Sequence, residues 1–157
     1  MLAAVDGDNP LLGTWHLERW EIAYGDGRAP TLPYGAEATG MICYTGDGSM
    51  SACIARGGRA RLSSDSVRSA PVAERLAAFE SFFQYAGRYA IQGEPGKQQV
   101  VHTVTHALNP NFVGTQQVRN MAFAADGLLT LSASDTLPGT TTARHHSLVW
   151  RRAKELQ

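Results

Sequence analysis

The sequence has almost no cysteine, no net charge and no long apolar segment, and each absence excludes a class of protein. Fourteen basic residues balance fourteen acidic ones, so the chain lacks the positive charge typical of proteins that bind nucleic acid or anionic membranes. Its apolar runs are much shorter than the roughly 20 residues that a membrane-spanning helix needs. We therefore expect neither a nucleic-acid partner nor a membrane partner.

The N-terminus also lacks the features of an export signal. Residues 1–8 read MLAAVDGD, with no basic start and no long apolar stretch, so we expect a cytoplasmic protein. The only two cysteines, Cys43 and Cys53, flank an Asp47-Gly48 turn and would lie on neighbouring strands of one hairpin. A disulfide between them is geometrically feasible, but free thiols are typical of the cytoplasm.

What the sequence does contain is a succession of strand patterns separated by turn residues. Gly46-Asp47-Gly48 and Asp126-Gly127 are typical hairpin turns, and the flanking residues are rich in aromatic and β-branched types. Strands are predicted at residues 13–24, 39–45, 49–55, 85–92, 98–108, 114–124, 128–134 and 143–152. Antiparallel strands in this number usually close into a barrel or fold into a sandwich.

One main helix is predicted, at residues 71–84. It begins with a proline, and an apolar residue recurs every three or four positions, which forms one apolar stripe. The stripe comprises Val72, Leu76, Phe79 and Phe83. We expect it to pack against the mouth or the end of the barrel. Residues 56–70 before it are small, polar and basic, and they predict a mobile loop.

Two short motifs resemble the signature of the calycin superfamily. Gly13-Thr14-Trp15 opens the first strand, and Trp150-Arg151-Arg152 ends the last one. In that superfamily an arginine packs across the tryptophan and closes one end of a β-barrel. The resemblance therefore implies that Arg152, or else Arg151, packs on Trp15.

Longer stretches resemble the bacterial and fungal lipocalin-like domain family over about residues 11–152. They are PYG at 33–35, GMICYTGDGSMSA at 40–52, AFESFFQYAGRY at 78–89, VVHTVTHALNPNFVGTQQVR at 100–119 and LVWRR at 148–152. The first strand departs from the family pattern, because Arg19-Trp20-Glu21 stands where members often have Ser-Tyr-Glu. The larger tryptophan implies a narrower pocket.

The resemblance implies an all-β fold in a single domain, 1–157. The fold would be a closed antiparallel lipocalin-like β-barrel of eight to nine strands with one main α-helix and an internal ligand cavity. It does not imply one reaction, because such barrels serve as carriers in some cases and as isomerases or cyclases in others.

Strand alternation groups the polar residues into candidate inner faces. Every second residue of a strand points to the same side, and the lumen of an eight-stranded barrel just accommodates a small ligand. The sequence does not show which side is inner, but the apolar residues favour two faces. These faces comprise Val100, His102, Val104 and His106 on one strand, and Gln117, Arg119, Met121 and Phe123 on another.

His102 and Arg119 are the candidate catalytic residues. A histidine can act as acid or base near neutral pH, and an arginine can polarise a carbonyl or hold an enolate or carboxylate. Together they suit a cofactor-free isomerase, cyclase or lyase that acts on a small lipophilic carbonyl compound. The alternative is a non-catalytic carrier, in which His102 is a core residue and Arg119 pairs with Glu21.

The remaining candidates are ligand-binding residues. Tyr44, Tyr85 and Tyr89 each offer an apolar ring with a polar tip, and Glu21 becomes a candidate general base if it is buried. Val104, His106, Met121 and Phe123 complete the predicted lining.

No metal is expected, because the adjacent His145 and His146 face opposite sides of a strand and no carboxylate stands at a diagnostic spacing. We expect no cofactor either, since the sequence has no phosphate loop and no dinucleotide fingerprint, although a haem pocket needs only one histidine. The oligomeric state stays open, a homodimer included.

Overall fold

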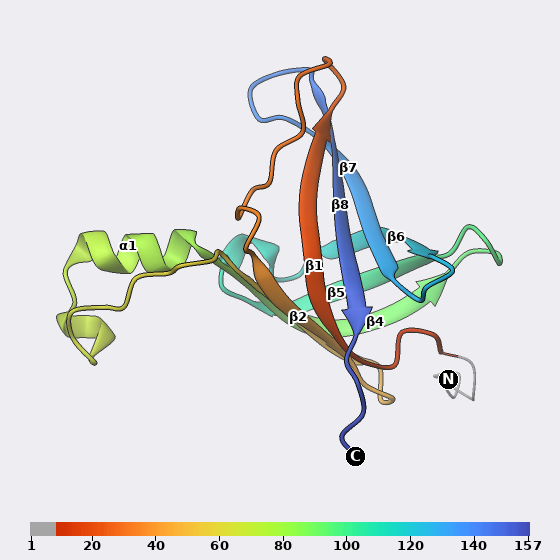
Figure 1. The fold of residues 1–157 in the computed structure, drawn as a ribbon, viewed down its shortest axis with the longest axis horizontal. Coiled ribbons are helices and arrows are strands. Elements are labelled where there is room, and N and C mark those ends of the chain that lie inside the picture. Colours follow the sequence, from red (N-terminus) through yellow and green to blue (C-terminus); the bar gives the residue numbers. More distant parts are fainter. Residues whose placement is uncertain (1–8) are drawn as a thin grey trace.

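A computed structural model describes residues 9–157, and its main body is a closed β-barrel (Figure 1). Eight antiparallel strands follow one another around the barrel in sequence order, and β8 pairs with β1. The strands are β1 Gly13–Tyr24, β2 Thr39–Tyr44, β3 Ser49–Ala55, β4 Phe82–Gln92, β5 Gln99–Ala107, β6 Gln116–Phe123, β7 Leu129–Thr136 and β8 Ala143–Arg152. The predicted closed antiparallel barrel with one main helix is confirmed.

The inward-facing residues of the strands form one core. Its members are Trp15, Ile42, Tyr44, Met50, Ala52, Ile54, Tyr85, Val100, His102, Val104, Met121, Leu129, Leu131 and Trp150. The face that carries Val100, His102 and Val104 therefore points inward, as predicted. Outside the core, parts of β1, β7 and β8 rise together beyond the other strands, at the top of Figure 1.

Trp15 and Arg152 close one end of the barrel. The Trp15 indole N–H donates a hydrogen bond to the Leu11 carbonyl at 2.9 Å, and the Arg152 guanidinium carbon lies 4.2 Å from the indole ring centroid. The same guanidinium donates to two backbone carbonyls of the segment before β1. The resemblance implied this pairing for one of two arginines. The partner is Arg152, because Arg151 pairs with Glu18 on the outer wall.

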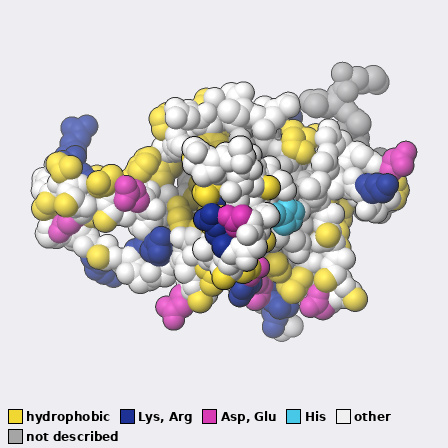
Figure 2. All heavy atoms as spheres, turned by 90° about the horizontal axis from the view of Figure 1, so that it is seen from above, with side chains coloured by type: hydrophobic (Ala, Val, Ile, Leu, Met, Phe, Trp, Pro, Cys, Tyr) yellow, Lys and Arg dark blue, Asp and Glu magenta, His cyan; other side chains and the backbone are white. Residues whose placement is uncertain are grey.

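The residues between β3 and β4 form an arm, residues 56–81, that stands away from the barrel at the left of Figures 1 and 2. It contains α1, Val72–Glu80, and the predicted packing of this helix on the barrel is wrong. Val72 is 70% exposed, Leu76 54% and Phe79 48%. No helix within residues 9–157 is long and apolar enough to cross a membrane.

The helix ends four residues earlier than predicted because β4 begins at Phe82. Residues 82 and 83 pair with the end of β3, where Phe83 lies opposite Ile54. Phe83 therefore packs against the barrel core rather than extending the helical stripe. Consecutive aromatic residues favour a strand over a helix, and pairing with β3 satisfies their backbone groups.

A bulge in β5 changes which side chains face inward. Gly87 of β4 pairs with Val104, but the preceding β4 residue pairs with His106, so Thr105 is an extra residue in β5. Alternation therefore reverses after Val104. His106 lies exposed on the outer wall, while Ala107 packs against the core. The prediction that His106 shares the inner face with His102 is wrong for this reason.

The cysteines lie on neighbouring strands of one hairpin, as predicted. In the register of β2 and β3, Cys43 stands opposite Ser51 and Cys53 opposite Met41, so the thiols are not a directly opposed pair. Both thiols are free.

Candidate functional site

The barrel encloses a cavity of about 420 Å³, to which all eight strands contribute. This volume lies within the range of about 300–1,000 Å³ that is common for small-molecule sites. The apolar part of the lining is Trp20, Ile42, Ala52, Ile54, Phe83, Phe112, Leu131, Ala133, Leu148 and Trp150. The polar part is Tyr85, His102, Gln117, Arg119, Ser134, Asp135, Arg144 and His146.

His102 is buried between two tyrosines. Its Nε2 lies 2.8 Å from the Tyr44 hydroxyl, and its Nδ1 lies 2.6 Å from the Tyr85 hydroxyl. Tyr85 lines the cavity, whereas Tyr44 lies behind the histidine and packs edge-on against Tyr89. Both ring nitrogens of His102 are thus occupied by protein groups, and the group next to the cavity is the Tyr85 phenol.

All three side chains are uncharged near neutral pH. Burial, together with a smaller effect of the positive charge of Arg119, lowers the pKa of His102 to about 3. Burial likewise raises the pKa of Tyr85 to about 12 and the pKa of Tyr44 well above its ordinary value. The neutral histidine therefore carries one N–H, which donates to one tyrosine, while its other nitrogen accepts from the second.

The surroundings of Tyr44 determine the direction of this chain. Within residues 9–157, the Tyr44 hydroxyl has a single side-chain polar partner, His102 Nε2, so it must donate there or leave a buried proton without an acceptor. His102 Nδ1–H then donates to the Tyr85 oxygen. The Tyr85 proton is left free to donate into the cavity.

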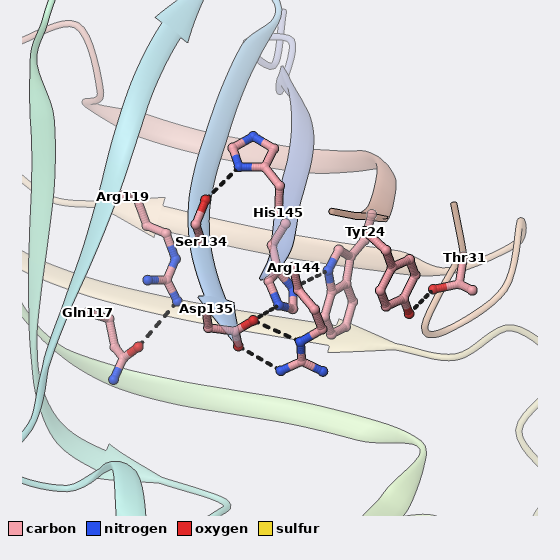
Figure 3. A network of polar contacts seen from close by, with 10 residues as sticks. Tyr24, Thr31, Gln117, Arg119, Ser134, Asp135, Arg144 and His145 are labelled. Carbon is pink, nitrogen blue, oxygen red and sulfur yellow. Dashed lines mark hydrogen bonds and ion pairs between the residues drawn. The ribbon is translucent and has the colours of Figure 1, made fainter. Parts of the chain in front are cut away.

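Arg119 is the only charged side chain of the lining without an ion-pair partner among the described residues. Its guanidinium donates to its neighbour's backbone, Val118 O, at 2.9 Å and to Gln117 Oε1 at 3.3 Å (Figure 3). Its positive charge acts to lower the pKa values of four side chains, Tyr44, Tyr85, His102 and His146. Arg119 thus sets a positive potential over much of the cavity.

Glu21, predicted as a general base or as the partner of Arg119, takes neither position. A bulge in β1 leaves Glu18 as an extra residue between Leu17 and Arg19, which turns Trp20 inward and Glu21 outward. Glu21 pairs with Arg19 on the outer wall instead.

A second polar cluster lies where β7 and β8 extend past the barrel (Figure 3). Arg144 donates two hydrogen bonds to the Asp135 carboxylate, at 2.8 and 2.6 Å, and His146 Nε2 lies 3.3 Å from the same carboxylate. The arginine holds the pKa of Asp135 below its usual value. The indole N–H of Trp20 points to His146 Nδ1 at 3.4 Å. The carboxylate of this cluster is therefore already neutralised.

Trp150 presents the one buried side-chain polar atom that lacks a partner within residues 9–157. Its side chain is 2% exposed and lines the cavity, and its indole N–H donates to no protein group. An unsatisfied buried donor costs about 1–3 kcal/mol, so an acceptor at this position would be favourable.

The other predicted site residues lie at different depths. Val104 and Met121 belong to the core but do not line the cavity. Tyr89 supports Tyr44 from outside the lining and donates to the Thr45 carbonyl at 2.8 Å. Phe123 is 45% exposed and packs near Trp15 at the closed end, because it lies at the end of β6.

Tyr85, predicted with Tyr44 and Tyr89 as a lining residue, lines the cavity, whereas sequence reasoning left out Trp150 as a site residue. Tyr85 lies four residues before Tyr89, so strand alternation already places both on one face. Trp150 was assigned only to the family motif that closes the barrel. Its partnerless N–H could be found only from the packing around it.

The histidines do not form a metal site in the part of the chain that is described. His145 is exposed and contacts Ser134 at 2.9 Å, whereas His146 lines the cavity, so the two face opposite sides as expected. No group of three or more histidine, cysteine or acidic side chains comes together within residues 9–157.

The buried histidine predicts a specific acid sensitivity. Below pH 6.5 the unfolded chain protonates His102, whereas the folded chain, with its pKa of about 3, does not. Folded and unfolded states then differ by one proton, so the free energy of unfolding falls by about 1.4 kcal/mol per pH unit. Between pH 6.5 and 5 we expect His102 to contribute a loss of about 2 kcal/mol, measured by urea unfolding.

His102→Gln should lack this contribution and show a shallower decline over the same pH interval. His106→Gln, on the outer wall, is the matched control and should follow the wild-type profile. Equal slopes for wild type and His102→Gln would contradict a neutral buried histidine.

The model of a family described as a lipocalin-like domain matches residues 12–153. A search of curated proteins finds no match to the chain.

Proposed function

The chain belongs to the lipocalin-like domain family, and we propose that it binds a small lipophilic, carbonyl-type molecule in its barrel cavity. A lipocalin-like barrel suggests small-molecule binding in general. The observation that carries the proposal for this chain is the Arg119 guanidinium in the cavity lining, which has no ion-pair partner among the described residues and donates only to Val118 O and Gln117 Oε1. Beside it, the lining residue Trp150 carries a buried indole N–H without a partner among the described residues.

The composition of the lining supports this proposal. Ten apolar side chains surround a small set of polar groups, which is how small-molecule sites combine affinity with orientation. A carbonyl oxygen bound near Trp150, Tyr85 or Arg119 would accept hydrogen bonds that the protein leaves unmade. Binding without chemistry requires nothing more than this arrangement.

A cofactor-free isomerase, cyclase or lyase is the second candidate, and the Tyr44–His102–Tyr85 chain favours it. At the end of this chain, Tyr85 could donate a hydrogen bond to a bound carbonyl oxygen, and Arg119 would stabilise the negative charge that develops on that oxygen. His102 would then act through Tyr85, because both of its nitrogens are occupied. Binding is the preferred proposal, since a histidine with a pKa of about 3 is a weak base near neutral pH.

The binding proposal is tested with phenylnaphthylamine, a neutral dye that fluoresces in apolar surroundings. We expect saturable binding of one dye per chain. Ala133→Phe, which projects a ring into the cavity, should weaken this binding about tenfold or more, because the ring occupies the ligand's space.

Ala122→Phe is the matched control, because Ala122 is exposed on the neighbouring strand β6 and lies outside the lining. It should bind the dye like the wild-type chain. Equal dye affinity in both variants would rule out the cavity as the binding site.

A further inference from the structure

The polar groups in the inner part of the cavity have one property in common: they donate hydrogen bonds. Arg119 offers guanidinium N–H groups, and Trp150 offers a partnerless indole N–H. Tyr85 offers its hydroxyl proton, because its oxygen accepts from His102 Nδ1 in the chain that begins at Tyr44. The neutral side chains of the lining that could accept, His102, Gln117, Ser134 and His146, already have protein partners. A ligand group that binds here must therefore be an acceptor.

The charge of the lining favours an anionic acceptor. Two arginines and one aspartate line the cavity, and Asp135 is already paired with Arg144. Arg119 therefore remains as a net positive charge. Arg119 is half-buried in the free protein. A neutral ligand that covered this guanidinium would leave only Val118 O and Gln117 Oε1 as its partners, and covering a charge without a matching anion is unfavourable.

The shape of the apolar part favours a flat ring. Five aromatic side chains line the cavity, and the order of the strands places them on opposite walls. Trp20 and Trp150 come from the neighbouring strands β1 and β8. The facing wall is a cluster of Phe83, Tyr85 and Phe112, whose ring centroids are 5.3 to 6.2 Å apart. Aromatic rings pack favourably against the faces and edges of other rings.

We propose that the ligand is a planar aromatic carboxylate, whose ring lies between the two aromatic walls and whose anionic oxygen is bound by Arg119, Trp150 and Tyr85. This inference rests on the proposed binding function and narrows it to one ligand class. An aliphatic acid would accept hydrogen bonds from the donors but would not pack as a ring between the aromatic walls. A neutral aromatic ester would pack between the walls but would not pair with the charge of Arg119.

The test compares three probes by isothermal titration calorimetry: naphthoate, methyl naphthoate and decanoate. Naphthoate and its ester share the same rings and differ in charge, whereas naphthoate and decanoate share the charge and differ in shape. We expect naphthoate to bind about tenfold tighter, or more, than either of the other two.

Each unfavourable result overturns a specific part of the proposal. Equal affinity for naphthoate and its ester would overturn the anionic group, and equal affinity for naphthoate and decanoate would overturn the aromatic slot. If none of the three probes binds while phenylnaphthylamine still binds in the cavity, the proposed ligand class is wrong but the binding function stands. If the dye does not bind either, both the binding function and the ligand class are wrong.

Variants assign the preference to individual groups. Arg119→Met should lose the preference for naphthoate over its ester, and unchanged ester affinity verifies that the variant is folded. Trp150→Phe keeps a ring and removes the N–H, so naphthoate should bind severalfold more weakly. The ester, whose carbonyl oxygen is a weaker acceptor than a carboxylate, should lose less affinity than naphthoate. Lys97→Met, on an exposed turn, is the matched control for charge removal and should behave as wild type. A preference that survives in Arg119→Met would overturn the assignment to Arg119.

Discussion

Replacing Trp15 by alanine is expected to lower the free energy of unfolding by about 3–5 kcal/mol, as truncation of a large buried aromatic side chain generally does. The side chain is 1% exposed, donates to the Leu11 carbonyl and supports the Arg152 guanidinium 4.2 Å above its ring. Its loss leaves a cavity at the closed end of the barrel and an arginine without its stacking surface. Urea unfolding monitored by circular dichroism measures the change.

Two arginines at adjacent positions provide the control for this closure. Arg152→Ala removes the cation that covers Trp15, together with two hydrogen bonds to backbone carbonyls, and should be clearly destabilising. Arg151→Ala removes an exposed ion pair with Glu18 and should cost at most about 1 kcal/mol. If both variants unfold at the same urea concentration, Arg152 does not have the closing role assigned to it.

Replacing Gly87 by alanine should destabilise the barrel by about 4 kcal/mol or more, a loss in the range of severe core disruptions. A Cβ at this position would lie 1.9 Å from the Thr103 carbonyl oxygen, which is backbone and cannot rotate away. Strand β5 approaches β4 this closely beside the bulge at Thr105. Relief of the clash therefore requires β4 and β5 to separate, and we expect poor expression or a much lower thermal midpoint.

Gly46→Ala is the matched control for this substitution. Gly46 lies in the turn between β2 and β3, and a Cβ there would meet no atom of the described chain within 4 Å. The variant should unfold within about 0.5 kcal/mol of wild type, as surface substitutions usually do. A stable Gly87→Ala variant would mean that the two strands do not approach as closely as the structure has them.

The sequence determined the strands and their order along the chain. The bounds of β1, β3 and β8 agree with prediction residue for residue, because the turn residues and the aromatic and β-branched residues that mark a strand are local features. The closure of the barrel by Trp15 also followed from a sequence motif. The end of the helix was predicted too late in the chain, because residues 82 and 83 pair with β3 and form the start of a strand.

Local sequence patterns predicted only part of the candidate site. His102 and Arg119 line the cavity, as strand alternation suggested, but His106 and Glu21 do not. Each of the latter two follows a bulge, at Thr105 and at Glu18 respectively, where one extra residue reverses the alternation. A bulge is defined by two residues opposing one on the neighbouring strand, so it depends on a pairing that no single strand pattern contains.

The tertiary structure alone brought Tyr44 of β2, Tyr85 of β4 and His102 of β5 into one hydrogen-bonded chain. Tyr85 and Tyr44 lie 17 and 58 positions from His102 along the sequence. The three side chains meet because β2, β3, β4 and β5 are successive strands of the barrel and turn their inner faces toward one another. The packing of the barrel also buries His102 and leaves the Trp150 indole N–H without an acceptor from the described residues. Local patterns thus determined which residues form strands. The register between strands decided which side chains meet, because hydrogen bonding, burial and charge act between neighbours in space.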